Sequence, residues 1–351
     1  VNTVDTRTGE LGDLMRLRFG LVIVMQLGTS AADAADAADL PRFSQLVSVS
    51  DRQIHVRQMG NQHQGPAIVL LSGPNENNHS DSAWFSALQP LLAQSYRVYA
   101  IDRPGQAFSS STERPSYFTF RHDIATVMQH FNERDLVVVA FSSGSISASA
   151  FYQTHKEDFN VRAMLWIDPD VPLPHSLSLY KGFPADWYRA NLAQLLPHLA
   201  TGAWTGRTEQ KIAAERKHAE HILGRHADLM DWAYFDAVSQ QRLNTANQQS
   251  RAREIANYAE DLDAYAALPA ISTIPVSMID SDFEQGLSSD NAEQAAALAL
   301  WQQEGSAWYR QQAERSNGQY IALSGSDHLV TLQHPDVIKT ALDWLVKQSS
   351  Q

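Results

Sequence analysis

The stretch Leu136-Val137-Val138-Val139-Ala140-Phe141-Ser142-Ser143-Gly144-Ser145 decides the fold of this chain. A short apolar run that is rich in β-branched residues is typical of a buried strand. The run stops at a serine flanked by small residues, and a segment with helical character, residues 146–151, follows at once. The stretch therefore predicts a strand that turns sharply into a helix, with Ser142 at the turn.

A serine held at such a turn is a candidate nucleophile. The pattern G-x-S-x-G is typical of a nucleophile elbow, where strand and helix backbones nearly touch and only small residues fit beside the serine. Here the pattern is Ala140-Phe141-Ser142-Ser143-Gly144, with alanine in place of the first glycine. The other interpretation is a buried strand followed by a serine-rich turn without a catalytic role.

The composition favours a globular protein and excludes several kinds of chemistry. The chain has 351 residues, 44% of them hydrophobic, enough for one large α/β domain with an insertion or for two domains. The formal net charge of -12 argues against nucleic acid and anionic membranes as main partners. Because the sequence contains no cysteine, disulfides, thiolate catalysis and cysteine-based metal sites are excluded.

The first residues have the features of an export signal. Arg16 and Arg18 precede a short apolar run at 19–27, and the small residues at 29–34 would suit a signal peptidase. We predict a signal peptide and linker over residues 1–40 and a periplasmic or secreted protein. The alternative is an ordinary amphipathic helix in a cytoplasmic protein. The apolar run is too short to span a bilayer, so we expect no membrane insertion of the mature chain.

Strands and helices alternate along most of the remaining chain. Strands are predicted at 45–49, 53–59, 67–71, 96–101, 136–140, 161–167, 275–279 and 320–323, and helices at 83–93, 120–131, 291–315 and 335–347. This alternation indicates a mostly parallel, doubly wound sheet. The pattern changes to aromatic-rich helical segments between the sixth and seventh strands. We therefore predict an α/β core over 41–170 and 270–351, with a helical cap inserted over 171–269.

Several separated motifs follow one another in a fixed order. They are Ser72-Gly73-Pro74, Asp102-Arg103-Pro104-Gly105-Gln106-Ala107-Phe108-Ser109, Ser142-Ser143-Gly144-Ser145 and Gly325-Ser326-Asp327-His328. Together they resemble the α/β-hydrolase superfamily, in particular its capped serine hydrolases of the esterase and proline-iminopeptidase type. The resemblance implies an α/β-hydrolase fold and a catalytic triad in the chain order serine, acid, histidine.

A serine hydroxyl needs a base within hydrogen-bond reach, and the base needs a third group to orient it. Ser142 fits the nucleophile and His328 the base. The acid is expected in the loop after the strand at 275–279, where aligning Ser281 with the family's glycine gives Glu284. Other carboxylates remain open at this point, namely Asp282 as the runner-up, Asp280, and Asp168 or Asp170 after the preceding strand.

The oxyanion hole of such an enzyme needs two backbone N–H donors. Ser143, next to the nucleophile at a helix N-terminus, supplies one of them. Pro74 has no N–H and cannot be the other. Matching Leu71-Ser72-Gly73-Pro74 to the family's His-Gly-Gly-Pro turn gives Gly73 as the second donor, with leucine in place of the histidine.

The resemblance implies a hydrolase of esters or related acyl bonds that uses no cofactor and no metal. Aromatic residues in the predicted cap favour a small-molecule substrate with a small or medium apolar acyl group. His218 and His221 have helical i, i+3 spacing but lack the H-E-x-x-H order of a zinc site, so we expect a solvated helix face there.

Other activities of the superfamily remain as alternatives. A serine at the elbow disfavours epoxide hydrolases and haloalkane dehalogenases, which resemble this family but use a carboxylate nucleophile. An aminopeptidase of the proline-iminopeptidase type, a hydrolase of carbon–carbon bonds, and a non-catalytic ligand-binding protein on the same fold all stay open.

Overall fold

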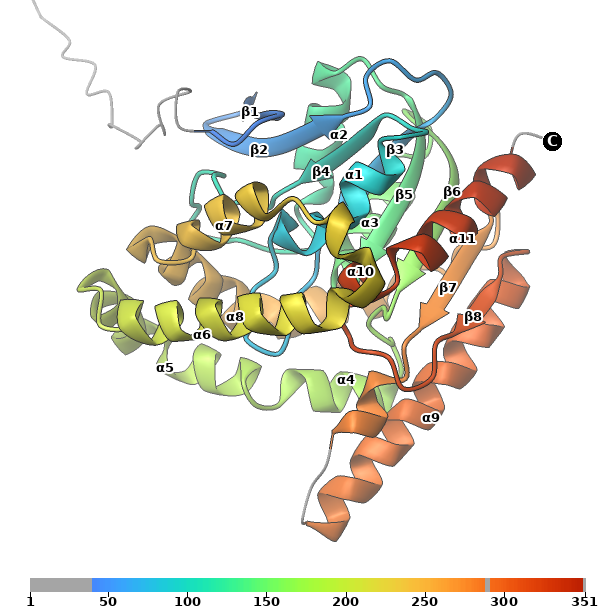
Figure 1. Ribbon diagram of the computed structural model, residues 1–351. Helices are drawn as coiled ribbons and strands as arrows, with labels where there is room; N and C mark the ends of the chain where they lie inside the picture. The colour runs from blue at the N-terminus through green and yellow to red at the C-terminus, as the bar shows by residue number, and fades with distance from the viewer. Residues whose placement is uncertain (1–39, 288–290, 350–351) are drawn as a thin grey trace, which may run out of the picture. The chain divides into compact units, whose positions relative to one another are not determined.

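An eight-stranded sheet lies at the centre of the computed structural model, which describes residues 40–287 and 291–349 (Figure 1). The strands are β1 (Ser44–Val49), β2 (Arg52–Met59), β3 (Ala67–Leu71), β4 (Val98–Ile101), β5 (Asp135–Phe141), β6 (Asn160–Ile167), β7 (Val276–Asp280) and β8 (Tyr320–Ala322). Their order is β1-β2-β4-β3-β5-β6-β7-β8. Only β2 runs antiparallel to its neighbours, β1 and β4, and the other pairs are parallel. The mostly parallel sheet predicted from the sequence is confirmed.

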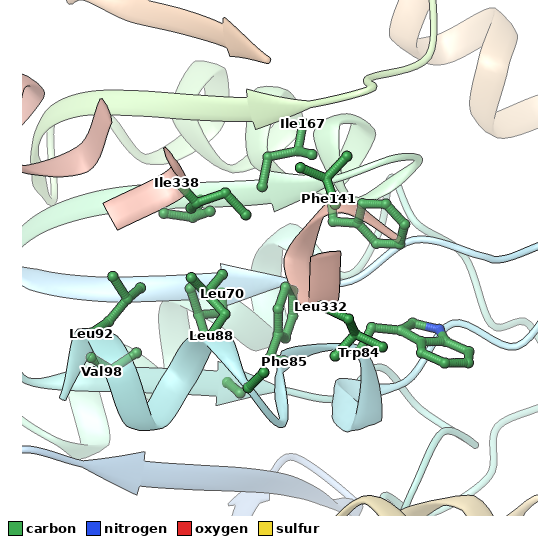
Figure 2. Close-up of a cluster of buried hydrophobic side chains, with 14 of the residues drawn as sticks. Leu70, Trp84, Phe85, Leu88, Leu92, Val98, Phe141, Ile167, Leu332 and Ile338 are labelled. Carbon is green, nitrogen blue, oxygen red and sulfur yellow. The ribbon is translucent and has the colours of Figure 1, made fainter. Parts of the chain in front are cut away.

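Helices cover both faces of this sheet. One face carries α1 (Leu88–Leu92), α10 (Val330–Gln333) and α11 (Pro335–Gln348), and the other carries α2 (Arg121–His130), α3 (Gly144–His155) and α9 (Ala292–Arg315). Successive strand residues point to opposite faces, so Leu70 belongs to the first core cluster and Val69 to the second. Figure 2 shows the first cluster, where Leu70 and Phe141 of the strands lie close to Leu332. Burial on both faces explains why β3 and β5 are continuous apolar runs.

The predicted helix over 83–93 is interrupted in the structure. A short 3₁₀ turn, η2 (Ser82–Phe85), precedes α1, and the two are separate elements. The backbone N–H and the hydroxyl of Ser86 both donate to the carbonyl oxygen of Ala83, at 3.1 Å and 2.7 Å. These bonds to residue i−3 close the 3₁₀ turn and end it before α1 begins.

Helices occupy the chain between β6 and β7, as the sequence predicted for residues 171–269. They are α4 (Pro174–Lys181), α5 (Ala185–Ala200), α6 (Thr205–Leu223), a 3₁₀ segment η3 (Gly224–Leu229), α7 (Trp232–Gln241) and α8 (Thr245–Ala266). Leu195 and Leu199 of α5 pack on Ala252 of α8 in a small core cluster of their own. We call α4 to α8 the inserted helices.

The predicted signal peptide and linker lie outside the described residues, apart from Leu40. Within 40–287 and 291–349, none of the helices combines the length and the apolar character needed to cross a bilayer. The helix predicted at 291–315 is confirmed as α9 and accounts for the long separation between β7 and β8.

Candidate active site

Ser142 occupies the turn between β5 and α3, as expected from the sequence. Its φ is 52°, a left-handed conformation that is strained for a residue with a side chain and is often found at functional sites. The backbone N–H of Ser142 donates to the carbonyl oxygen of Ile167, the last residue of β6, at 2.8 Å. The neighbouring strand therefore helps to hold the serine at the turn.

Close backbone approach explains the small residues around this turn. A Cβ atom added to Gly144 would lie 2.3 Å from the carbonyl oxygen of Leu71. One added to Gly73 would lie 2.4 Å from the backbone nitrogen of Ser143. Ala140, which replaces the first glycine of the usual pattern, is fully buried in β5 without disrupting the strand. The pattern is thus satisfied by an alanine at its first position.

His328 lies in the loop between β8 and α10 and is held by Asp168. Its Nδ1 atom is 3.0 Å from Oδ2 of Asp168, a residue only 5% exposed that directly follows β6. Ser281 fixes the same carboxylate, donating its N–H to Oδ1 at 2.8 Å and its hydroxyl to Oδ2 at 2.6 Å. The rings of Phe141 and Phe283 lie against the imidazole, with centroids 4.8 Å and 4.2 Å away. Asp168 therefore orients His328 through the Nδ1 atom.

This arrangement corrects the expectation that Glu284 orients the histidine. Glu284 lies in the 3₁₀ segment η4 (Phe283–Gly286), and its side chain makes no hydrogen bond to His328 within the described chain. Burial, with the charges of Asp168 and Asp280, raises the pKa of Glu284 to about 8. A carboxyl group that is mostly protonated at neutral pH cannot stabilise an imidazolium as a carboxylate does.

The other carboxylates left open by the sequence have different partners. Asp282 accepts from Gln285 and Gln302, Asp280 from Ser306 and Tyr320, and Asp170 from Tyr258. Burial raises the pKa of Asp170 above its usual value. Oxygen atoms of Asp280, Asp282 and Glu284 lie within 4.8 Å of one another, but acidic groups at such distances are common without an ion. The cluster does not by itself indicate a metal site.

The unusual pKa of Glu284 leads to a prediction about stability. Its pKa in the folded protein is about 8, above the ordinary value of 4.5. Between these two pH values the folded protein therefore keeps a proton on Glu284 that the unfolded protein has released. The free energy of unfolding therefore falls as pH rises through this window. Glu284→Gln removes this penalty. We expect the variant to gain stability relative to wild type between about pH 5 and pH 8, by a few kcal/mol at most.

Urea unfolding of both proteins across this pH range measures the effect. A Glu293→Gln variant, which changes an exposed glutamate in the first turn of α9, is the control and should show no such pH-dependent difference. A stability difference between Glu284→Gln and wild type that stays constant with pH would contradict the buried, protonated state.

The environment of His328 also has a consequence for its protonation. Burial alone would lower the pKa of His328, but the hydrogen bond and charge of Asp168, with the charge of Asp327, raise it above its usual value. A general base acts in its deprotonated form. Activity that depends on His328 should therefore fall on the acid side with a midpoint above about 6.5.

Ser142 and His328 line one cavity of about 620 Å³. In the described part of the chain, the Ser142 hydroxyl has no hydrogen-bond partner. Catalytic hydrogen bonds often shorten only when substrate is present, so this free hydroxyl is compatible with a nucleophile. Apolar and aromatic residues form much of the remaining wall, including Pro74, Tyr180, Phe283, Leu287, Trp301 and Tyr309. Such a wall suits an apolar ligand group.

Gly73 and Ser143 are buried and lie beside Ser142. A Cβ atom on Gly73 would lie 2.7 Å from the Cβ of Ser142, which shows how closely the loop after β3 approaches the nucleophile. Among the residues that the structure describes, neither N–H donates to a protein acceptor. Buried backbone donors are rarely left unpaired. Two such donors next to a nucleophile are suited to hold an oxyanion.

A buried ion pair holds the loop that carries Gly73. Arg103 donates from Nε to Glu254 Oε1 of α8 at 2.7 Å and from Nη1 to the carbonyl oxygen of Ser72 at 2.5 Å. The two charged residues are 1% and 3% exposed. The loop that carries Gly73 is thus held through a contact between the Asp-Arg-Pro-Gly segment and an inserted helix.

Replacing Glu254 with glutamine should leave the charge of Arg103 buried without a counter-charge. We expect the free energy of unfolding to fall by about 3–5 kcal/mol, as is typical when one partner of a buried ion pair is removed. Urea unfolding measures this loss. Glu260→Gln changes an exposed glutamate on the same helix and should cost less than about 0.5 kcal/mol. Equal losses in both variants would show that the buried pair has no special role.

The histidine pair on α6 differs in part from its predicted solvated state. His221 is exposed, but His218 lines the same cavity as His328. Its Nε2 atom lies 2.7 Å from Oδ2 of Asp327. This contact was hidden from sequence reasoning because Asp327 is more than a hundred residues away. No metal-ligating group within the described residues includes either histidine.

The strand order, the serine turn and the histidine loop define an α/β hydrolase. A family model described as the alpha/beta hydrolase family matches residues 68–341, and the chain belongs to that family. The resemblance inferred from the motifs is therefore confirmed, together with the fold class.

Comparison with individual proteins adds less detail. AB hydrolase superfamily protein YfhM of Bacillus subtilis (strain 168) is 26% identical over 151 residues, covering 42% of this chain and 50% of the relative. The chain spans about half the length of the curated relatives it matches.

Solved structures with different activities are similar in fold. Epoxide hydrolase VrEH1 of Vigna radiata is 14% identical, with a TM-score of 0.58 over 87% of this chain and 98% of that one. A thermophilic esterase of Thermogutta terrifontis is 16% identical, with a TM-score of 0.56 over 88% and 100%. At these identities the similarity shows the fold alone. Family and fold together support hydrolase activity, and the bond that is cleaved must be argued from the site.

Proposed function

We propose that this protein is a serine hydrolase that cleaves an ester, or a related acyl bond, through an acyl-enzyme. Ser142 is the nucleophile, His328 the general base and Asp168 the acid. The proposal is supported above all by the contact between Asp168 and Nδ1 of His328. His328 lines the same cavity as Ser142, which lies at a strained turn. A base oriented by a buried carboxylate next to an otherwise weak nucleophile is the arrangement that serine catalysis requires.

The first half of the reaction forms the acyl-enzyme. The Ser142 oxygen attacks the substrate carbonyl carbon while His328 Nε2 takes the hydroxyl proton. Negative charge develops on the carbonyl oxygen, and the N–H groups of Gly73 and Ser143 stabilise it. Collapse of this intermediate breaks the bond to the leaving group, which receives the proton from His328.

The second half releases the acid. A water molecule loses a proton to His328 and attacks the acyl carbon, with the same two N–H groups holding the oxyanion. The bond to Ser142 then breaks, and its oxygen recovers the proton from His328. Asp168 holds the Nδ1 side of the ring and stabilises the imidazolium that forms in each half.

The substrate is a small molecule with an apolar acyl group. The aromatic and apolar wall of the cavity supports this choice. An epoxide hydrolase is disfavoured because a serine stands where that mechanism uses a carboxylate. Aminopeptidase activity has weaker support, because two of the cavity carboxyls are poorly suited to bind an amine: Glu284 has a raised pKa, and Asp327 contacts His218.

We further propose that the inserted helices act as a cap over the site. Tyr180 of α4, His218 of α6 and Tyr258 of α8 line the cavity together with residues from the strand ends. Tyr258 also donates to Asp170 at 2.6 Å and lies 2.7 Å from the Ser143 hydroxyl. Its phenol group therefore links the cap to the residue that carries one oxyanion donor.

An active-site-directed fluorophosphonate tests the proposal directly. Such a reagent phosphonylates only a serine that is activated by a base, so we expect one equivalent bound at Ser142, located by peptide mass spectrometry. Heat-unfolded protein and Ser142→Ala should not be labelled. A folded wild-type protein that ignores the reagent but binds a small ligand would favour the non-catalytic alternative.

A further inference from the structure

A second cavity, of about 760 Å³, lies among the inserted helices. Its wall combines residues of α5, α6 and α8 with the loop at 75–78. Three of its lining residues are cations: Arg207 and Lys211 from α6 and Arg251 from α8. We call it the cationic cavity. It is distinct from the active-site cavity, although Asn75 and Glu76 contribute to both.

The three cations of this cavity outnumber its acidic lining, which in the described part of the chain is Glu76 alone, and none of them forms an ion pair. Within residues 40–287 and 291–349, Arg207, Lys211 and Arg251 make no ion pair and no side-chain hydrogen bond. The nearby carboxylate of Glu215 is already bonded to Arg242, at 2.7 Å. Burial and the charges of Arg251 and Arg207 lower the pKa of Lys211, against the opposing charges of Glu215 and Glu76.

Such a group is unexpected in a protein with a formal net charge of -12. Its 39 acidic residues outnumber 27 basic ones, so carboxylates to pair with surface cations are plentiful. Cations that are crowded together repel one another, and an anion between them would remove that repulsion. The cluster therefore has the electrostatics of an anion-binding site.

Aromatic side chains also line the cationic cavity, and we call them its aromatic wall. The ring of Tyr188 lies against Trp187 and Trp204, with centroids 5.2 Å and 6.3 Å apart. Trp187 is 39% exposed and Phe183, which also lines the cavity, is 80% exposed. Large aromatic side chains left this open to solvent are typical of ligand-binding surfaces.

We propose that the cationic cavity binds a small organic anion, whose carboxylate or phosphate group lies among Arg207, Lys211 and Arg251 and whose apolar part packs on the aromatic wall. The ligand must have both parts, because both cationic and aromatic side chains line the cavity. This site does not depend on chemistry at Ser142, and it holds whether or not the protein is an esterase.

Isothermal titration calorimetry of the full chain with phenyl phosphate and phenylacetate tests the proposal. We expect at least one of them to bind in a salt-sensitive manner, since exposed charges are screened at high ionic strength. Lys211→Gln and Arg251→Gln should each weaken binding by about ten- to a hundredfold, the cost of a lost contact to a charged group. Lys217→Gln is the matched control, because it removes the same charge from an exposed position of α6.

Four outcomes would overturn the proposal or the role it gives to the aromatic wall. Benzyl alcohol, which has the ring but no charge, could bind as tightly as the anions. Lys217→Gln could weaken binding as much as Lys211→Gln, which would indicate attraction by overall charge only. His218→Gln, at the active-site cavity, could abolish binding while Lys211→Gln does not. That result would place the anion in the active-site cavity. Inorganic phosphate binding as tightly as phenyl phosphate would overturn the role given to the aromatic wall.

Discussion

Asp168→Asn is expected to lower kcat by a factor of about 10³–10⁴ while leaving the fold intact. Asparagine keeps the size of the side chain and an oxygen that can accept from the backbone N–H of Ser281. It no longer carries the charge that stabilises the imidazolium, and its amide group favours the wrong tautomer of His328. The carboxylate now bonds to Nδ1 at 3.0 Å, so the change acts directly on the base.

Hydrolysis of p-nitrophenyl butyrate measures this loss, and far-UV circular dichroism checks the fold. Glu284→Gln is the decisive comparison, because that residue lines the same cavity but does not bond to the histidine. We expect its kcat at neutral pH to change by less than about tenfold, since wild-type Glu284 is already mostly protonated there. The reverse ranking of the two variants would return the role of the acid to Glu284.

Ser142→Ala is expected to have the larger effect, a loss in kcat of about 10⁶, as found when a triad nucleophile is removed. Without the hydroxyl no acyl-enzyme forms, so the burst of nitrophenol in the first turnover should also vanish. Any residual rate would come from water activated by His328 and from the two oxyanion donors. The measurement uses steady-state and stopped-flow kinetics with the same ester.

The adjacent serine supplies a matched control. Ser143→Ala removes a hydroxyl that contacts Tyr258 but keeps the backbone N–H, so we expect a loss within about tenfold and an intact burst. If Ser143→Ala were the inactive variant, the nucleophile would have to be reassigned within the Ser-Ser pair. If Ser142→Ala kept full activity, the serine mechanism itself would be wrong.

Local sequence patterns predicted a large part of this fold. β3 and β5 are continuous apolar runs, and such runs predict strands that are buried on both faces. The turn at Ser142 was also predictable, because only small residues fit beside such a turn and the sequence has Ala140 and Gly144 there. The predicted helix at 83–93 was wrong in its continuity, since the bonds of Ser86 to Ala83 that end the 3₁₀ turn leave no periodic signal.

The carboxylate that contacts His328 was decided by the tertiary structure. Asp168 and Glu284 follow neighbouring parallel strands, β6 and β7, so the sequence alone placed both near His328. Which of them bonds to the ring depends on the surroundings that folding creates: Ser281 donates two hydrogen bonds to Asp168 and holds it in place, and burial near like charges raises the pKa of Glu284 to about 8. Steric patterns along a chain are local and can be read from it, whereas the protonation of a buried group depends on residues distant in sequence.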